Sequence, residues 1–375
     1  MFMKNYLMNY IRNGDTPFIK KTKKMLHVAE KKRVYFKHAL AQEFPKIIRP
    51  DIETVTIALT SKCNLRCKGC SYGRDFMPLE QLSLEKVKEV LRSTKAMNIQ
   101  YVWFYGGEAA MIKSSDLIEM IRYATELGLT STLGTNGVML DDKMMKELYA
   151  VGLRRIAVGF YGVSEEYEEY VDRKDVFSQL ENNIENIRKN YPSVSISLGW
   201  LLMKATCTVE AVDDLIEFSK KHDIPFSINL VHYDFPYFVT EDEESTLLLN
   251  EEDLPQIIKV QEALSTVKRA YPHLVRNSLT GINSISEWLL KKEKITIPCY
   301  RYDYLWVAAN GEVRVCQKAA LLGNIHEKPL DEIIYTKEHT QSARDCFALH
   351  CTGCNVDWDD RTTSTPKSRK QFEMH

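Results

Sequence analysis

Hydrophobic positions between Asp51 and Val231 follow two alternating spacings. Short apolar runs rich in β-branched and aromatic residues are separated by longer stretches in which apolar residues recur every three or four positions. The first spacing is typical of buried strands and the second of amphipathic helices. The apolar runs predict six strands: Val55–Thr60, Tyr101–Tyr105, Leu129–Gly134, Arg155–Tyr161, Val194–Leu202 and Phe226–Val231.

The helical stretches are bounded by residue types that favour the beginning or the end of a helix. Ser83 is placed to cap the stripe that starts at Leu84, and Gly128 is placed to end the stripe that starts at Leu117. Six strand–helix units in succession predict an α/β fold with a parallel sheet and right-handed crossovers. Closed or partly closed, this is a partial (β/α)6 TIM-like barrel, in which ligands bind at the C-terminal ends of the strands.

The remaining segments divide the chain around this core. Residues 51–235 form the predicted barrel core, and residues 1–50 form a basic N-terminal helical extension with a lysine run at Lys20–Lys24. We interpret that run as a solvated helical face; the alternative is a docking arm for an acidic partner or a membrane surface. Residues 236–295 predict a helical bridge with an acidic loop at Thr240–Glu244, residues 296–361 a small α+β domain, and residues 362–375 a frayed tail.

Charge and cysteine usage restrict the class of protein. Lys and Arg number 50 against 51 Asp and Glu, so there is no general attraction to nucleic acid. No apolar run is long enough to span a membrane and no secretory signal is visible, which predicts a cytoplasmic protein. Nine cysteines, mostly in two groups, argue against a disulfide framework and indicate metal ligation.

The first cysteine group directly follows the first predicted strand. Cys63, Cys67 and Cys70 are soft thiolate ligands that suit iron–sulfur clusters or zinc. Three thiolates leave one iron of a four-iron cluster free of protein ligands, whereas a structural zinc site requires a fourth nearby ligand, which the sequence does not place close by. The spacing therefore favours an iron–sulfur cluster at the mouth of the barrel.

This CxxxCxxC spacing resembles the signature of the radical S-adenosylmethionine (SAM) superfamily. The resemblance implies that a reduced [4Fe–4S] cluster cleaves S-adenosylmethionine to a 5′-deoxyadenosyl radical, which removes a hydrogen atom from the substrate. It implies binding roles for the Gly106-Gly107-Glu108 motif (methionine amino group), for Thr135 and Asn136 (ribose) and for Arg173 (methionine carboxylate). An aromatic residue usually precedes the third cysteine; here it is Gly69, so Tyr72 or Phe76 is expected to contact the adenine. Many relatives have a serine where this chain has Gly159.

The second cysteine group resembles the C-terminal auxiliary-cluster domains called SPASM and, when shortened, twitch. Cys299, Gly311 and Cys316 form a C-x11-G-x4-C pattern around a predicted hairpin at Asn310-Gly311. The resemblance implies one auxiliary [4Fe–4S] cluster, held by Cys299, Cys316, Cys351 and Cys354. Cys346 is expected to be a buried apolar residue or a replacement ligand, and four thiolates at this spacing also suit zinc.

An auxiliary cluster with four cysteine ligands favours electron transfer, and hence net oxidation. The first functional hypothesis is a radical SAM dehydrogenase or epimerase of a sugar, aminocyclitol or related small polar metabolite, with a flavodoxin or ferredoxin-type electron donor. The alternatives are a peptide- or protein-modifying radical SAM maturase and a non-catalytic zinc-binding scaffold. Cys207 is a candidate hydrogen-atom donor, although an inert buried thiol is the simpler interpretation. His232, Tyr233 and Asp234 follow the sixth strand and are candidate substrate contacts.

Overall fold

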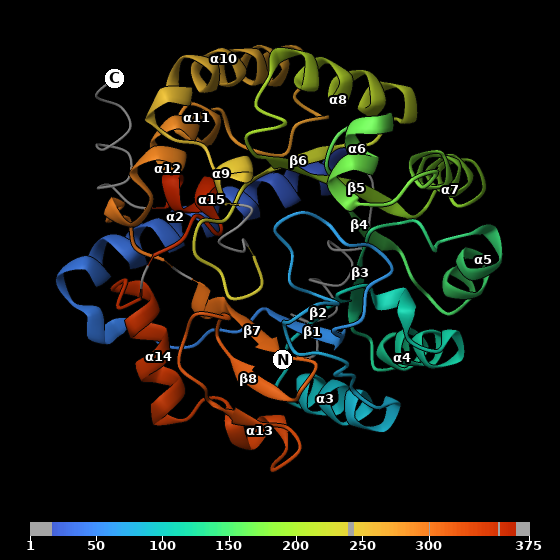
Figure 1. The fold of residues 1–375 in the computed structure, drawn as a ribbon. Coiled ribbons are helices and arrows are strands. Elements are labelled where there is room, and N and C mark those ends of the chain that lie inside the picture. Colours follow the sequence, from blue (N-terminus) through green and yellow to red (C-terminus); the bar gives the residue numbers. More distant parts are fainter. Residues whose placement is uncertain (1–16, 239–243, 300, 352, 365–375) are drawn as a thin grey trace.

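The computed structural model describes residues 17–238, 244–299, 301–351 and 353–364. Six parallel strands and the helices between them form the core, as Figure 1 shows in a view along the barrel. Each predicted strand is present and its ends agree to within one residue. The strands are β1 (Thr54–Thr60), β2 (Tyr101–Gly106), β3 (Thr130–Thr135), β4 (Arg155–Phe160), β5 (Ser195–Leu202) and β6 (Phe226–Leu230).

Helices surround these strands on the outside (Figure 1). The Ser83 hydroxyl accepts a hydrogen bond from the Lys86 amide and caps the first of them as predicted. Gly128 has φ +71° just beyond the end of α4, where a left-handed residue favours glycine. These helices are α3 (Leu84–Ala96), α4 (Ser114–Glu126), α5 (Asp142–Ala150), α6 (Ser164–Val171), α7 (Phe177–Asn190) and α8 (Val209–His222).

The two faces of the barrel strands carry different side chains, as β5 illustrates, and the inner face leaves room for the site. In β5, Ile196, Leu198 and Trp200 are buried in the hydrophobic core. The alternate residues Ser195, Ser197 and Gly199 line the interior cavity of the barrel. Side chains alternate between the faces of a strand, so small and polar residues on the inner face leave the lumen open. The pattern of apolar runs alone had predicted strands buried on both faces.

The C-terminal segment continues the same sheet. Strand β7 (Tyr304–Val307) pairs in parallel with β1, and β8 (Glu312–Arg314) pairs antiparallel with β7 across the predicted Asn310-Gly311 turn. With β9 (Gly323–Asn324) the sheet order is β6-β5-β4-β3-β2-β1-β7-β8-β9. The hairpin between Cys299 and Cys316 is therefore part of the sheet whose strand β1 precedes the first cysteine group.

Further helices cover the two open edges. Helices α9 to α12 form the bridge, and α13 to α15 follow the hairpin. The buried residue Thr362 accepts a hydrogen bond from Trp288 Nε1 at 2.8 Å, so the predicted tail begins inside the fold; its remainder from residue 365 lies outside the described residues. The helices are α9 (Glu244–Leu247), α10 (Leu254–Ala270), α11 (Leu279–Ile282), α12 (Ile285–Lys291), α13 (Leu330–Ile333), α14 (Lys337–Phe347) and α15 (Trp358–Thr363).

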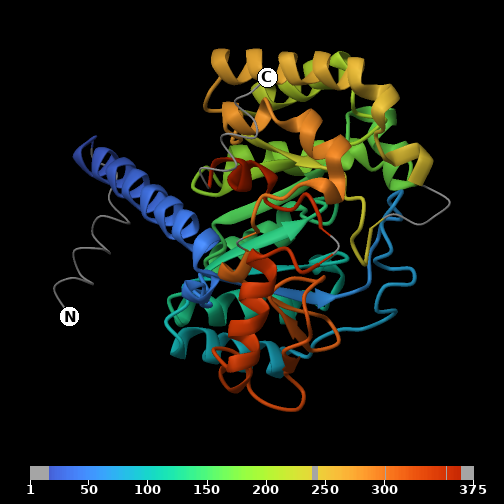
Figure 2. The same cartoon turned by 90° about the vertical axis from the view of Figure 1, so that its left-hand side faces the viewer.

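The predicted N-terminal extension is a long helix, α2 (Pro17–Glu43), followed by a short 3-10 helix, η1 (Pro45–Ile47). Figure 2 shows α2 projecting from one side of the barrel. Its C-terminal part is anchored where buried His38 hydrogen-bonds Tyr302 at 2.6 Å. Residues 1–16 and most of the acidic loop at 240–244 lie outside the described residues, and no helix in the described part is long and apolar enough to cross a membrane.

Candidate active site

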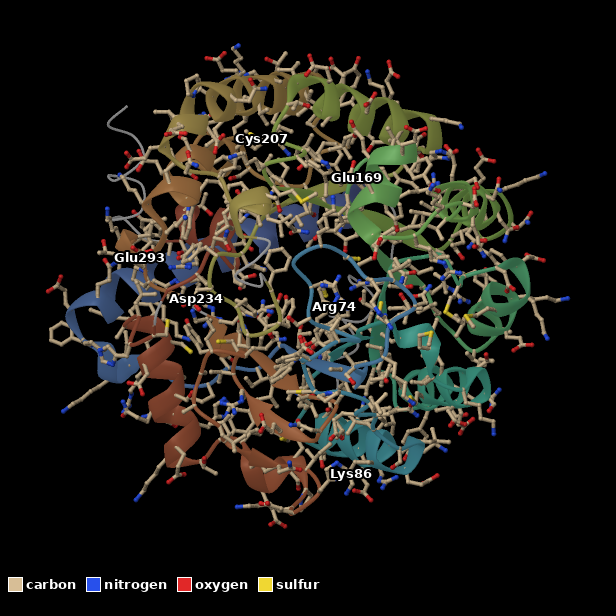
Figure 3. All side chains as sticks on the ribbon, viewed as in Figure 1. Arg74, Lys86, Glu169, Cys207, Asp234 and Glu293 are labelled. Atoms are coloured by element: carbon tan, nitrogen blue, oxygen red, sulfur yellow. The ribbon has the colours of Figure 1, made fainter. Side chains whose placement is uncertain are left out.

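The first cysteine group lies on the loop that follows β1, and all three of its cysteines line a large cavity. Short local bonds shape the loop: the Leu65 amide lies 3.4 Å from Cys63 Sγ, and the Cys70 amide donates to Cys67 O at 3.2 Å. Arg74 donates to the carbonyl of Arg66 at 2.7 Å and thereby cross-links the loop. Figure 3 places Arg74 near the centre of the view along the barrel.

The chemistry of these thiols fits a cationic cluster. Burial raises the pKa of Cys63 to about 11 and raises that of Cys67 well above its ordinary value, and in both cases neighbouring thiols raise it further. Three mutually close, desolvated thiolates require a positive partner, since each disfavours the ionisation of the others. Iron ions provide that charge and prefer thiolate ligands.

The Gly-Gly-Glu motif lies where β2 ends, beside the cysteine loop. A Cβ atom at Gly106, which has φ +151°, would lie 2.2 Å from Thr60 O, and one at Gly107 would lie 2.4 Å from Lys62 O. The Gly107 amide donates to Thr60 O and the Glu108 amide donates to Lys62 O, both at 2.8 Å. Both glycines are thus required by the close approach of two backbone segments.

Glu108 ties the end of β2 to the end of β3. The Thr135 hydroxyl donates to Glu108 Oε1 at 2.8 Å, and the Asn136 amide donates to Glu108 Oε2 at 2.7 Å. Burial raises the pKa of Glu108, and these hydrogen bonds oppose the rise. The Asn136 side chain in turn donates to Asn64 Oδ1 at 2.7 Å. Glu108, Thr135 and Asn136 therefore position the loop, and the expected ribose contacts of Thr135 and Asn136 stay predictions.

Two other expected cofactor contacts have different surroundings. Arg173 is exposed and donates to Asn64 O at 3.2 Å, and it is not among the residues that line the cavity. Tyr72 is buried and lines the cavity, where its ring packs against Tyr237 with centroids 5.2 Å apart. At Gly69, φ is +71° and a Cβ atom would lie 2.4 Å from the Leu247 side chain, so packing against the bridge excludes an aromatic residue there.

The second cysteine group converges from four separate segments. Burial raises the pKa of Cys299 most strongly, and the thiols of Cys354 and Cys316 raise it further. The pKa of Cys354 is raised by burial and by the neighbouring thiols of Cys316 and Cys351. The four predicted auxiliary ligands are thus near enough to influence one another electrostatically, although Cys351 is exposed, and a four-thiolate set suits an iron–sulfur cluster.

Cys346 belongs to this group as well. Its thiol donates a hydrogen bond to Cys316, which lowers the pKa of Cys316 and raises that of Cys346. The residue is buried on α14, as the sequence predicted, but its partner is a sulfur atom and not merely the apolar core.

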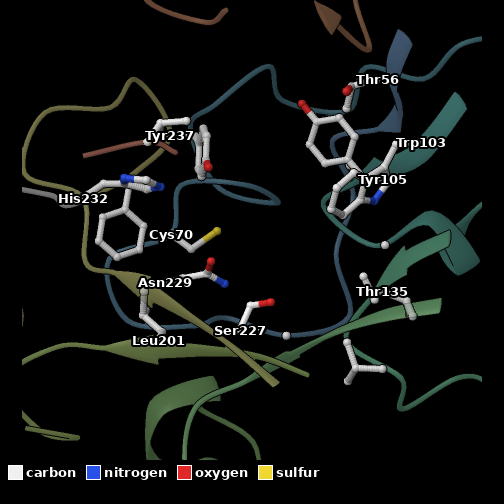
Figure 4. A pocket seen from close by; sticks show the side chains of 18 of the residues that line it. Thr56, Cys70, Trp103, Tyr105, Thr135, Leu201, Ser227, Asn229, His232 and Tyr237 are labelled. Carbon is white, nitrogen blue, oxygen red and sulfur yellow. The ribbon is translucent and has the colours of Figure 1, made fainter. Parts of the chain in front are cut away.

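One cavity joins the two cysteine groups. Its volume is about 1070 Å³, and its lining includes Cys63, Cys67 and Cys70 of the first group and Cys316 of the second. Figure 4 shows Cys70, Tyr237, Asn229 and Ser227 around this space. A molecule in the cavity is therefore accessible to both sites.

Sequence patterns gave no sign of an aromatic cluster in the wall between the two sites. Tyr105 Oη accepts hydrogen bonds from Trp306 Nε1 and from Gln317 Nε2, the latter at 3.3 Å. Tyr105 and Trp306 come from β2 and β7, on either side of β1 in the sheet. Gln317 directly follows Cys316, and Tyr105 directly precedes the Gly-Gly-Glu motif. The position of Tyr105 and Gln317 next to the two motifs is the one feature of the sequence that points to them.

Two residues that follow barrel strands have contrasting positions. His232 lines the cavity, and the adjacent Asp234 forms an ion pair with Lys318. Cys207 is buried in the core, where burial and the charge of Asp253 raise its pKa to about 12, and it is not among the cavity-lining residues. In Figure 3, Cys207 lies near α8 and α10, far from Arg74. This placement offers no support for hydrogen donation by Cys207.

Comparison with known families identifies the core. Residues 57–218 match the model of the radical SAM superfamily. Residues 57–218 therefore form a radical SAM domain. Domains of this family bind S-adenosylmethionine and a [4Fe–4S] cluster, and the three thiols of the first cysteine group fit that cluster.

Curated proteins that are similar to this chain carry several activities. An AdoMet-dependent heme synthase from Methanosarcina barkeri is 24% identical over 80% of this chain and 89% of its own length. An Fe-coproporphyrin III synthase from the same organism is 29% identical over 43% of this chain and 40% of its own length. A PqqA peptide cyclase from Rhodopseudomonas palustris is 35% identical, but over 29% of this chain and 28% of the relative. The chain spans about half the length, or less, of several of these relatives.

Solved structures share the fold over most of the chain. SuiB from Streptococcus suis, bound to S-adenosylmethionine, gives a TM-score of 0.60 at 15% identity and covers 92% of this chain and 78% of that one. A structure of anSMEcpe with bound AdoMet gives 0.59 at 16% identity, with 86% and 96% covered. At these identities the likeness shows the partial barrel and its C-terminal continuation, and no specific reaction.

Proposed function

We propose that this radical SAM enzyme catalyses the net two-electron oxidation of a small polar metabolite bound in the cavity between its two cysteine groups. The observation that carries the proposal is the shared cavity, which is lined by Cys63, Cys67 and Cys70 of the first group and by Cys316 of the second. A substrate there has a source of radicals on one side and an electron acceptor on the other.

In this proposal Cys63, Cys67 and Cys70 hold the SAM-binding cluster, and Cys299, Cys316, Cys351 and Cys354 hold an auxiliary [4Fe–4S] cluster. When bound, the first cluster and S-adenosylmethionine supply the 5′-deoxyadenosyl radical. The protein orients the cysteine loop through Glu108 and Asn136, and the buried Tyr72 and the half-buried Tyr237 exclude water beside Cys70. Exclusion of water protects a reactive carbon radical from side reactions.

The lumen supports a polar substrate. Ser197 and Ser227 present hydroxyl groups, and Asn229 presents an amide, from β5 and β6. Such groups hydrogen-bond substrate hydroxyl or amino groups, as the sugar or aminocyclitol hypothesis requires. The names of the relatives favour tetrapyrrole, nucleotide or peptide chemistry over sugars. A peptide is the second candidate substrate, supported by the local similarity to PqqA peptide cyclase and by the shared fold of SuiB bound to its precursor peptide.

The test uses the full chain, reconstituted anaerobically with iron and sulfide and reduced with dithionite. The enzyme is incubated with S-adenosylmethionine and with two panels, one of polyols, sugars and aminocyclitols and one of synthetic peptides. Mass spectrometry then follows 5′-deoxyadenosine and any compound that loses two hydrogen atoms. A small metabolite oxidised in proportion to 5′-deoxyadenosine supports the proposal. Turnover of peptides alone favours the second candidate, and colourless protein that binds zinc contradicts both.

A further inference from the structure

His232 follows β6 and presents its imidazole to the cavity that joins the two cysteine groups. The ring stacks on Phe235 with centroids 4.8 Å apart and an interplanar angle of 24°, and it meets the edge of Phe238 at 5.9 Å. Figure 4 shows the His232 side chain directed toward the interior, near Tyr237. Two aromatic contacts hold the ring in one orientation, so its two nitrogen atoms have distinct surroundings.

The neighbouring Asn355 determines which nitrogen carries the proton. Asn355 is 2% exposed, and its Nδ2 donates to Val231 O at 2.6 Å. Since a backbone carbonyl can only accept, the orientation of the amide is fixed and its Oδ1 faces His232 Nδ1 at 2.7 Å. An amide oxygen also can only accept, so Nδ1 must be the protonated nitrogen. The lone pair of the neutral ring therefore lies on Nε2.

This Nε2 atom is available as a base. No hydrogen bond or ion pair to Nε2 is present among the described residues. Burial lowers the pKa of His232, and the positive charges of Arg301 and Lys318 lower it further. The hydrogen bond to Asn355 and the charge of Asp357 act in the opposite direction. The balance keeps the ring neutral near pH 7, which is the state that accepts a proton.

We propose that His232 is a catalytic residue whose Nε2 accepts the proton lost by the substrate during its oxidation. The proposal rests on the proposed function. After the 5′-deoxyadenosyl radical takes the hydrogen atom from a C–H bond, the substrate carbon radical carries an O–H or N–H group. The O–H or N–H bond breaks, its proton forms a bond to Nε2, and the carbon–heteroatom double bond forms. The remaining electron is accepted by the iron–sulfur cluster at the second cysteine group, and the imidazolium later returns its proton to water.

Asn355 is then a positioning residue, because it acts on the substrate only through His232. It connects the base to the second cysteine group, since it directly follows Cys354. The segment that carries Cys354 therefore also holds the imidazole of His232 through one hydrogen bond. This arrangement suits a step in which a proton and an electron leave the same carbon radical.

The first test needs neither a cluster nor a substrate. Apo protein labelled with ¹⁵N-histidine contains nine histidines, and the His232 signals are assigned as those missing from His232→Gln. Long-range ¹H–¹⁵N spectra across pH 5 to 8 are expected to show the neutral form with a protonated Nδ1 and a pKa below the ordinary value of 6.5. In Asn355→Asp a carboxylate replaces the amide, so the pKa is expected to rise. A protonated Nε2, or a pKa of 6.5 or above in the parent protein, overturns the proposal.

A chemical probe reports the accessibility of Nε2. Diethyl pyrocarbonate acylates unprotonated imidazole nitrogen, and peptide mass mapping locates the product. His232 is expected to react, whereas the fully buried His38 and His339 serve as unreactive controls. Absence of reaction at His232 in protein whose exposed His326 and His350 react would contradict a cavity-facing base.

The decisive test is coupling in the turnover assay. Product formed per 5′-deoxyadenosine is expected to fall on the order of a hundredfold in His232→Gln, the usual contribution of a positioned base. His222→Gln is the matched control, since His222 is buried against Glu181, at 3.1 Å, and does not line the cavity. Unchanged coupling in His232→Gln overturns the inference and leaves the proposed function standing. Failure of the parent enzyme to oxidise any small metabolite defeats the proposed function, while the protonation state of His232 is still measured separately.

Discussion

The two cysteine groups differ in how they are built. The first occupies eight consecutive residues on one loop, and neighbouring backbone amides and the side chain of Arg74 set its shape. The second is gathered from β7, β8, α14 and α15 and the loops beside them. The first therefore depends on local geometry, and the second depends on the sheet pairing that brings the hairpin beside β1. A short motif specifies the first, whereas tertiary structure selects the members of the second.

The largest expected effect comes from removing one thiol of the first group. Cys67→Ala is expected to lower 5′-deoxyadenosine formation by at least about a thousandfold, or about 4 kcal/mol of barrier, because the cluster loses a ligand. Iron at the second group is expected to remain, because the two groups are built independently. Chromatography of 5′-deoxyadenosine and iron analysis check both points, with Cys207→Ala as a control outside the cavity. Loss of iron from both groups would show that they do not assemble separately.

The next effect tests the close backbone approach at the first group. Gly107→Ala places a methyl group 2.4 Å from Lys62 O and is expected to displace the Gly-Gly-Glu turn. We expect S-adenosylmethionine to bind at least about tenfold more weakly, or about 1.4 kcal/mol. Equilibrium binding to the reconstituted protein measures this. Gly128→Ala is the matched control, since it strains a left-handed glycine at the end of α4 without touching the cavity; equal weakening by both variants would assign the effect to general instability.

A buried carboxyl near the second group predicts a pH effect. Burial and the charge of Asp357 raise the pKa of Asp303 to about 8, and its Oδ1 has no hydrogen-bond partner among the described residues. The unfolded chain loses this proton near its ordinary value of 3.8, so stability is expected to fall as the pH rises from about 4 to about 8. The slope is at most about 1.4 kcal/mol per pH unit for one proton.

Asp303→Asn is expected to remove that slope. Urea unfolding of the apo protein at pH 5 and pH 8 measures it, and the free energy of unfolding of the variant relative to the parent should be higher at pH 8 than at pH 5. Identical pH dependence in parent and variant would show that Asp303 ionises normally in the folded chain. The second cysteine group would then not differ from the first by a neighbouring carboxyl group that stays protonated in the folded chain.

The smallest effect concerns the fifth thiol of the second group. Cys346→Ala is expected to keep auxiliary iron at about four atoms per chain, because Cys346 acts as a hydrogen-bond donor to Cys316. Loss of that hydrogen bond is expected to lower the reduction potential of the auxiliary cluster by some tens of millivolts, since hydrogen bonds to sulfur tune such clusters. Spectroelectrochemistry measures the shift. Loss of iron in Cys346→Ala would instead make Cys346 a ligand, and the same variant series on Cys351 would then identify the residue it replaces.

Much of the barrel follows from the sequence alone. The apolar runs determined all six strands, and the C-x3-C-x2-C spacing identified a radical SAM loop at the end of the first one. Both succeed because their causes are local: side-chain periodicity for the strands, and ligand spacing for the loop. The hairpin at Asn310-Gly311 was predictable for the same reason.

Other features depended on contacts between residues far apart in sequence. The lone pair of His232 Nε2 is set by an amide 123 positions away, and Cys346 finds Cys316 only because α14 packs against the segment that follows β8. Likewise, Cys207 follows a barrel strand, yet its thiol is buried in the core. The sequence by itself determined which barrel strands form and which strand the first cysteine group follows. The tertiary structure decided which side chains meet in the cavity. The reason is that the partners of His232 and Cys346 are distant in sequence, and only packing brings them into hydrogen-bonding distance.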